Sequence, residues 1–146
     1  MMDALKKFLQ EQELITIATY ATNPWIINVF YGIDEDTNIY FIMPENTQTA
    51  ENIKEQNTVA FATAAYSTHT NRKGIQGRGV IHKASTREEI QRGVQIHNTR
   101  FPVFKERINE QYVKEGNTAV WVLRPTQIQF WNDELYPEKT KKFTFT

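Results

Sequence analysis

A series of short segments in this chain has the composition of β-strands, and polar turns separate each segment from the next. Each segment is rich in β-branched or aromatic residues and is bounded by Asn, Asp, Pro or Gly. In one of them Val59 and Phe61 face one side while alanines occupy the other, which leaves a flat strand face. The predicted strands span residues 14–20, 25–33, 38–43, 57–66, 74–83, 118–124 and 126–131, with Pro125 separating the last two.

Helical signals are confined to short stretches around these strands. Apolar residues recur at helical spacing in residues 4–9, and residues 46–55 begin with capping side chains. A capping box, formed by Ser85 with Glu88 or by Thr86 with Glu89, begins a helix that reaches residue 99. A further helix is predicted to start at Phe101-Pro102. With no internal repeat and no linker, we expect a single domain over residues 1–146. It belongs to the α+β class but is mainly β, and its six-stranded antiparallel sheet closes into a small barrel with short flanking helices.

The charge balance restricts the partners of the protein. Lys and Arg together number 17, as do Asp and Glu, so the formal net charge is zero. Nucleic acids and anionic membrane surfaces favour basic proteins, and we therefore expect neither as a partner. The chain has no cysteine, which excludes disulfides, thiolate nucleophiles and iron–sulfur clusters. Its N-terminus lacks a signal peptide, and no apolar run approaches the ~18 residues that span a bilayer, so a cytoplasmic location is predicted.

Motifs for self-contained catalysis do not occur in the sequence. There is no GxSxG, HExxH, GxGxxG or P-loop pattern, and no catalytic residue is assigned. His69, His82 and His97 fall on a predicted loop, strand and helix, a distribution that predicts no metal site. Any reaction is therefore expected to rely on a bound organic cofactor, for which the protein supplies shape and polarity.

Two local features suit such a cofactor, and each has a structural alternative. Asn46-Thr47-Gln48-Thr49 opens a predicted helix, where hydroxyls, N–H groups and the positive end of the helix dipole would hold a phosphate. The alternative is ordinary helix capping, which needs one of these oxygens, and Glu51 in the same turn would repel an anion. Gly77 and Gly79 share a strand face that a flat ring could approach; alternatively, they relieve bending at a barrel corner.

A set of short motifs in a fixed order carries a family resemblance. The motifs are Thr16-Ile17-Ala18-Thr19, Pro24-Trp25, Asn28-Val29-Phe30-Tyr31, Tyr40-Phe41, Thr47-Gln48-Thr49, Asn52-Ile53, Val59-Ala60-Phe61, Gly74-Ile75-Gln76-Gly77-Arg78-Gly79 and Asn98-Thr99-Arg100-Phe101-Pro102-Val103, followed by the strand at 128–130. In this order they resemble the pyridoxamine 5′-phosphate oxidase-like FMN-binding split barrels, and most closely the YhbP-like bacterial members. The resemblance covers nearly the whole chain.

The resemblance implies a homodimer in which two split barrels bind two FMN molecules in the clefts between the subunits. Four residues of one strand would line the isoalloxazine ring with backbone and side chain, namely Ile27, Asn28, Val29 and Phe30. Thr47 and Thr49 would approach the phosphate. Gln76 and Arg78 would lie near the cleft, as would Trp131.

The sequence departs from the authentic oxidases where cations hold the FMN phosphate. Ile27 or Asn28 stands in the place of an Arg, and Thr49 stands in the place of a Lys. Charge-assisted hydrogen bonds to a phosphate contribute ~1.5–3 kcal/mol each, so their replacement matters. The candidates to supply the charge from other segments are Lys54, Arg72 and Lys73.

Arg100 has two interpretations. Between two predicted helices, its guanidinium could reach an anionic ligand at the dimer cleft. The alternative is that it binds carbonyl groups at the end of the preceding helix and fixes the corner between the helices. No counterpart of the oxidases' substrate-binding Arg occurs near the C-terminus, so synthesis of pyridoxal phosphate is not expected.

Two functions are consistent with the sequence. The first is a homodimeric, FMN-binding, flavin-dependent oxidoreductase that acts on an unidentified small molecule. The second is a split-barrel dimer that has lost FMN and serves as a non-catalytic ligand-binding or stress-associated module. The retained hydroxyls and the ring-lining strand favour the first, whereas the missing cations favour the second.

Overall fold

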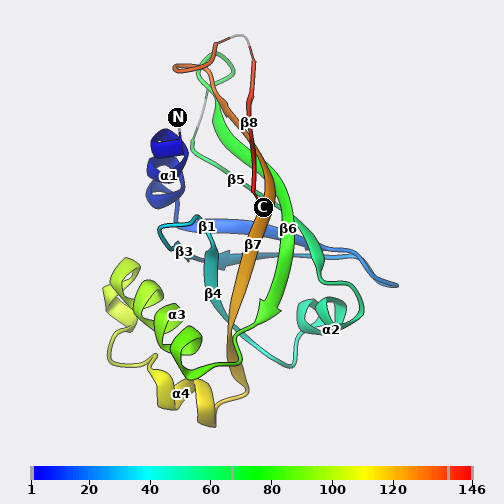
Figure 1. The fold of residues 1–146 in the computed structure, drawn as a ribbon, viewed down its shortest axis with the longest axis vertical. Helices are drawn as coiled ribbons and strands as arrows, with labels where there is room; N and C mark the ends of the chain where they lie inside the picture. The colour runs from blue at the N-terminus through cyan, green and yellow to red at the C-terminus, as the bar shows by residue number, and fades with distance from the viewer. Residues whose placement is uncertain (1, 67, 138, 146) are drawn as a thin grey trace.

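The computed structural model describes residues 2–66, 68–137 and 139–145, and it consists of a twisted antiparallel sheet with helices around it (Figure 1). No helix of these residues is long and apolar enough to cross a membrane. In chain order the elements are α1 (Met2–Glu11), β1 (Leu14–Thr19), β2 (Trp25–Phe30), β3 (Gly32–Ile33), β4 (Ile39–Pro44), α2 (Gln48–Glu55), β5 (Thr58–Ala64), β6 (Lys73–Lys83), α3 (Arg87–Arg100), the 3-10 turn η1 (Pro102–Phe104), α4 (Glu110–Glu115), β7 (Thr118–Asn132) and β8 (Lys141–Thr144).

The strand β7 joins the two parts of the sheet. The strand order is β2-β1-β5-β6-β7-β4-β3, β8 pairs with β7 outside this path, and these pairings are antiparallel. One part of the sheet is β2-β1-β5-β6, and the other is the β3–β4 hairpin. The predicted class is confirmed: the fold is a mainly β, antiparallel split barrel, and the described chain adds four α-helices to it.

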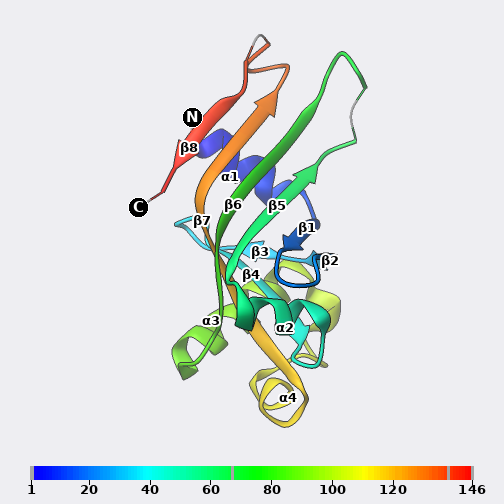
Figure 2. The ribbon, with the colours of Figure 1, turned by 90° about the vertical axis from the view of Figure 1, so that its right-hand side faces the viewer.

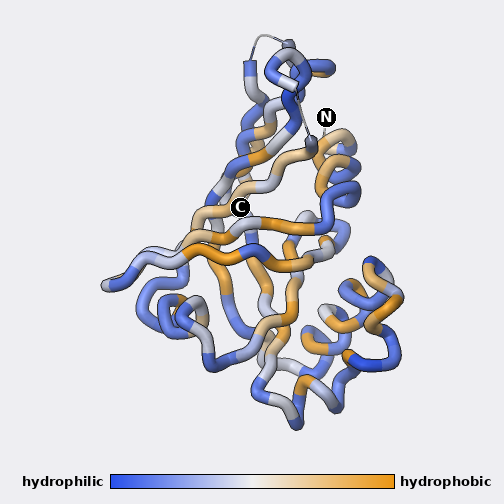
Figure 3. Tube along the Cα trace, turned by 180° about the vertical axis from the view of Figure 1, so that it is seen from behind, coloured by the Kyte–Doolittle hydropathy of each residue, from blue (hydrophilic) through white to orange (hydrophobic). Residues whose placement is uncertain are grey.

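The inward face of the sheet holds the main apolar core. Alternate residues of the strands are buried there, among them Ile17, Phe61 and Phe130. The helix α1 covers one side, and its Phe8 ring lies 5.4 Å from that of Phe130. Hydrophilic residues gather instead where β5 connects to β6 and β7 to β8, at the end of the molecule away from α3 and α4 (Figure 3). The core therefore lies under the middle of the sheet.

A second, smaller core lies between α3 and the strands β4 and β7. Its buried members are Tyr40, Ala84, Val113, Val120 and Val122. The backbone of α3 approaches β7 closely at Gly93, where a Cβ atom would lie 2.3 Å from Val120 Cγ1. Glycine at this position therefore sets the distance between α3 and the sheet. The helix α4 packs beside α3 at the same end of the molecule (Figure 1).

Three details differ from the sequence-based expectation. Pro125 does not end a strand, because it lies at a register shift opposite Gly79, where β7 needs no ladder hydrogen bond from that position. The residues 25–33 form β2 and a separate short strand β3, with Tyr31 between them. The charged tail contributes β8, which lies along β7 (Figure 2). The seven predicted strand segments correspond to β1, β2 with β3, β4, β5, β6 and β7, because the last two segments form one strand.

Candidate functional site

A cavity of about 320 Å³ lies where β2 and β4 face the segment from α3 to α4. We call it the β2–α3 cavity. Such a volume is at the lower end of the range of small-molecule sites. None of its lining residues is Lys, Arg, Asp or Glu, and four are aromatic or imidazole rings; the lining residues are Leu14, Asn28, Val29, Phe30, Ile42, Pro44, His97, Phe104, Ile108, Tyr112 and Thr118.

The strand β2 forms one wall of the β2–α3 cavity. The side chains of Asn28 and Phe30 point away from the core, while Val29 is half-buried against it. Asn28 Oδ1 accepts a hydrogen bond of 2.5 Å from the Thr16 hydroxyl of β1. The ring of Phe30 meets Phe101 edge to face, with 5.1 Å between centroids. Three of the four residues predicted to line a flavin ring thus line one cavity, while Ile27 packs against the main core.

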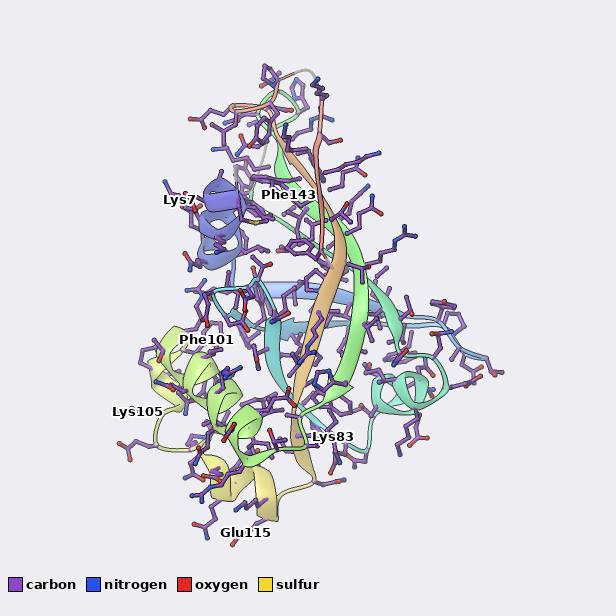
Figure 4. The ribbon with its side chains drawn as sticks, in the orientation of Figure 1. Lys7, Lys83, Phe101, Lys105, Glu115 and Phe143 are labelled. Atoms are coloured by element: carbon purple, nitrogen blue, oxygen red, sulfur yellow. The ribbon has the colours of Figure 1, made fainter. Side chains whose placement is uncertain are left out.

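The helix α3 forms the opposite wall, and sequence reasoning missed its contribution. His97 is only 5 % exposed, and its ring centroid lies 5.4 Å from that of Phe101 and 5.5 Å from that of Phe104. Phe101 stands at the end of α3, as labelled in Figure 4. His97, Phe104 and Tyr112 come from a segment with no recognisable binding motif. The packing of α3 against β4 and of α4 against β7 brings them to the cavity.

The helix α2 begins beside this cavity. Pro44 lines the cavity, and the Thr47 hydroxyl lies 3.3 Å from the Pro44 carbonyl oxygen, to which it donates. Thr47 has extended backbone angles and its oxygen accepts from Ala50 N at 3.1 Å, so it is the N-cap of α2. Thr49 points inward: it is 1 % exposed, and its hydroxyl is the one buried side-chain oxygen or nitrogen of the described residues that has no hydrogen-bond partner.

Two lysines near α2, the candidate Lys54 and Lys83, are paired with carboxylates. Lys54 on α2 lies 3.5 Å from Glu51. At the end of β6 near α2, where Figure 4 labels it, Lys83 lies 2.5 Å from Glu45 of the β4–α2 connection. Glu45 lies two residues before the N-cap Thr47, so Lys83 is paired near the N-terminus of α2, whereas Lys54 stands in the last turn of that helix.

Arg72 and Lys73 are not near α2, contrary to the expectation that they would compensate there. They stand at the start of β6, ten residues before Lys83, which corresponds to ~33 Å of strand. Arg72 donates from its backbone N to Asp133 at 2.8 Å and from Nε at 3.1 Å, and these contacts hold the pKa of Asp133 below its usual range. Lys73 donates to Glu134 at 2.7 Å and lowers the pKa of that carboxyl.

Gln76 and Arg78 lie on the outward face of the sheet, away from the β2–α3 cavity. They line a separate shallow hollow of about 370 Å³ with Ala60, Gly77, Gln127 and Gln129. Pairing places Asn28 opposite Thr16, Thr16 opposite Ala62 and Ala62 opposite Gln76. Asn28 and Gln76 therefore share one face and one row but are three strand spacings apart, roughly 14 Å. The chain does not bring these two sets together within one subunit.

Gly77, Gly79 and Trp131 each have close packing contacts in the structure. A Cβ at Gly77 would lie 2.6 Å from the Phe61 ring, and one at Gly79 would lie 2.4 Å from the Arg124 carbonyl oxygen, so both glycines serve close packing at the bend of β6. Trp131 is half-buried, with its ring against Gly74.

The expected contact of Arg100 with the end of α3 is wrong, whereas its contact with a ligand at a dimer cleft stays a prediction. Arg100 binds a carbonyl group, but that of Gln12 in the α1–β1 connection, at 2.8 Å, rather than one at the end of α3. Its guanidinium carbon also lies 5.4 Å from the centre of the Phe101 ring. Arg100 lines a different cavity, between α1, β3 and α3. The side chain therefore tethers the end of α3 to the N-terminal part of the chain.

The fold is an antiparallel split barrel with an uncharged cavity between β2 and the segment from α3 to α4. The chain belongs to the pyridoxamine 5′-phosphate oxidase family, whose sequence profile matches residues 1–132. This agrees with the resemblance carried by the sequence motifs.

The relatives of the chain extend along most of its length. It is 27 % identical over 135 residues to a UPF0306 protein of Klebsiella pneumoniae (strain 342), covering 90 % of this chain and 85 % of that protein. It is 26 % identical over 137 residues to the UPF0306 protein YhbP of Escherichia coli (strain SMS-3-5 / SECEC), covering 92 % and 86 %.

Solved structures share the fold at low sequence identity. A heme binding protein of Mycobacterium smegmatis superposes with a TM-score of 0.75 at 17 % identity; the match covers 95 % of this chain but only 55 % of that protein. A NimC/NimA family protein of Clostridium acetobutylicum superposes with a TM-score of 0.69 at 14 % identity, covering 99 % and 93 %. These likenesses establish the fold alone.

Proposed function

We propose that this protein binds FMN as a homodimer and acts as a flavin-dependent oxidoreductase on a small molecule. One observation carries the proposal: the segment Asn28-Val29-Phe30, at the ring-lining position of the family, forms a wall of an uncharged, aromatic-lined cavity. Flat rings pack well against aromatic side chains, and a cavity without charges suits a neutral ring system.

The residues around α2 offer FMN a phosphate position made mainly of neutral donors. Thr47 is the N-cap of an eight-residue helix whose dipole favours an anion, whereas the Thr49 hydroxyl is buried and is not open to a ligand at this turn. When bound, FMN supplies hydride and electron transfer. The chain's own part is to hold the ring between β2 and α3, to exclude water there, and to hold the phosphate at α2.

The exposed apolar side chains of the outward sheet face support the dimer of this proposal. This face carries the exposed apolar side chains of Leu14, Ile26, Phe30 and Val80, beside the exposed alanines of β5. Antiparallel sheets commonly leave one face to solvent, but that face is then mainly polar. Packing two copies face to face would bury this surface. It would also bring Gln76 and Arg78 of one copy towards the β2–α3 cavity of the other, whereas within one subunit these residues lie away from that cavity.

The test compares FMN with riboflavin, which has the same ring but no phosphate. Thr47→Asp keeps an N-cap oxygen, so α2 stays capped, but it places a negative charge at the phosphate position. We expect FMN affinity to fall by about tenfold to a hundredfold, the value of one or two charge-assisted contacts, while riboflavin affinity is unchanged. Thr86→Asp, the same change at the N-cap of α3, is the matched control and should alter neither affinity.

Flavin fluorescence and the visible absorption spectrum report the binding, and sedimentation reports the dimer. Failure of the unmodified protein to bind FMN at micromolar concentrations would refute the flavin function. Equal effects of Thr47→Asp on FMN and riboflavin would refute the phosphate position at α2. A monomer at working concentration would refute the intersubunit cleft.

A non-catalytic binding module without FMN is the second candidate function. The observation that favours it is the pairing of Lys54 with Glu51 and of Lys83 with Glu45, which leaves α2 without an uncompensated cation. A protein that binds neither FMN nor riboflavin but takes other uncharged rings into the β2–α3 cavity would establish this function over the first.

A further inference from the structure

A hydrogen-bond chain fixes which nitrogen of His97 carries the proton. Asn98 Nδ2 donates to the carbonyl oxygen of Ile108 at 2.6 Å, so the amide is oriented with its Oδ1 towards the imidazole. That oxygen lies 3.1 Å from His97 Nδ1. Because a side-chain amide oxygen only accepts hydrogen bonds, Nδ1 must be the donor. In the neutral ring, Nε2 is then left with a lone pair as an acceptor.

The acceptor Nε2 of His97 has no partner in the described chain, and it is open to the cavity. Among the described residues, the contact of Nδ1 with Asn98 is the one hydrogen bond that the His97 ring makes. Among the described residues, Thr49 Oγ1 is the one side-chain nitrogen or oxygen that is both fully buried and without a partner. Because Nε2 of His97 also lacks a partner, it is not fully buried. His97 lines the β2–α3 cavity. A small molecule in that cavity therefore meets an oriented hydrogen-bond acceptor.

The other walls of the cavity restrict the kind of molecule that can bind beside Nε2 of His97. Phe30 on β2, Phe104 on η1 and Tyr112 on α4 present ring surfaces, and Leu14, Ile42 and Ile108 add aliphatic ones. With no Lys, Arg, Asp or Glu in the lining, a charged group would lose its hydration there without a counter-charge. Flat rings between other rings gain both apolar burial and favourable edge or offset contacts.

We propose that the β2–α3 cavity binds a planar, uncharged aromatic molecule that carries a ring N–H or phenolic O–H group, and that this group donates to Nε2 of His97. The inference rests on the proposed function in that both use this cavity, but it requires no contact with a phosphate. His97 is thereby a ligand-contacting residue, and Asn98 is a positioning residue that acts through it.

Phenol and toluene test the proposal, because they match in shape and differ in the hydroxyl donor. With the unmodified protein labelled with ¹⁵N-histidine, millimolar phenol should shift the Nε2 resonance of His97 and leave those of His69 and His82 in place. Toluene should produce a smaller shift. This measurement needs no variant, so it does not depend on the folding of one.

The variant His97→Phe keeps a ring in the packing and removes the acceptor. We expect it to weaken phenol binding roughly two- to tenfold, the effect of one neutral hydrogen bond, and to leave toluene binding unchanged. His82→Phe is the control, because His82 contacts Glu89 at 3.1 Å and does not line the cavity. Its phenol affinity should equal that of the unmodified protein.

The inference is overturned if phenol binds no more tightly than toluene, or if it binds without moving the His97 Nε2 resonance. A separate FMN titration distinguishes the two proposals. Phenol binding through His97 without FMN binding refutes the flavin function and supports this inference. FMN binding in a protein that does not discriminate phenol from toluene refutes this inference alone.

Discussion

Replacing Thr49 with valine should make the protein more stable, although the change removes a hydroxyl group. The Thr49 side chain is 1 % exposed and its hydroxyl has no partner among the described residues. Burying an unpaired hydroxyl costs about 1–3 kcal/mol in proteins, and valine has nearly the same shape and a similar helix propensity. Thr49→Val should therefore raise the free energy of unfolding by about 1–3 kcal/mol.

The same substitution at Thr19 provides a matched comparison. Thr19 is also buried, but its hydroxyl accepts from Asn52 Nδ2 at 2.9 Å and donates to the Trp25 carbonyl oxygen at 3.3 Å. Asn52 Nδ2 keeps a second partner in the Asn23 carbonyl oxygen, so Thr19→Val should cost only about 1 kcal/mol. The two variants should therefore differ by about 2–4 kcal/mol, in opposite directions from the parent.

Urea unfolding followed by tryptophan fluorescence measures both variants. If Thr49→Val destabilises the protein as much as Thr19→Val does, the Thr49 hydroxyl is satisfied in solution and the reasoning is wrong.

Two further predictions concern packing and charge. Gly93→Ala should gain about 1 kcal/mol of helix propensity but lose about 1–3 kcal/mol to overlap with Val120, for a net loss of about 1 kcal/mol. In a Val120→Ala background, which lacks the overlapping atoms, it should become a gain of up to about 1 kcal/mol; equal losses in both backgrounds in a double-mutant cycle would contradict the reasoning. The pKa of Asp133 is lowered, chiefly by the hydrogen bond from the Arg72 backbone N–H. The stabilisation of the folded state by this carboxylate is therefore complete above about pH 4, and it is lost as pH falls through the lowered pKa. Asp133→Asn should therefore be less stable than the parent at pH 7, and urea midpoints should converge towards pH 3.

Local patterns predict most of the sheet because strand signals here coincide with burial. Residues such as Ile15, Ile17, Val59 and Phe61 alternate in the sequence and are buried in the structure. At Pro125 the sequence predicts the end of a strand, but the strand continues. Proline interrupts a strand ladder unless a bulge removes the need for its missing N–H group. Here the bulge depends on Gly79, which lies 46 positions earlier and pairs with Pro125 only in the folded sheet.

The candidate site is less predictable because two distant segments build it. The family resemblance directs attention to Asn28 and Phe30, which do line the cavity. His97 shows no such signal, since a lone histidine in a helix has no binding pattern around it. Its role follows from the distance between α3 and the sheet, and from the Asn98 contact with Ile108, neither of which is written in local periodicity.

Synthesis from the N-terminus leaves β4 and β6 without their shared neighbour until residues 118–132 have left the ribosome. Ile39 cannot pair until Leu123 has been synthesised, and Lys83 cannot pair until Trp121 has been, because β7 pairs with both strands. Until then the nascent chain holds a partial sheet and a separate hairpin, each with an open edge. Closing such long-range pairings is slow, so folding should finish in a late step, and chaperones have most access to the chain just before β7 is complete.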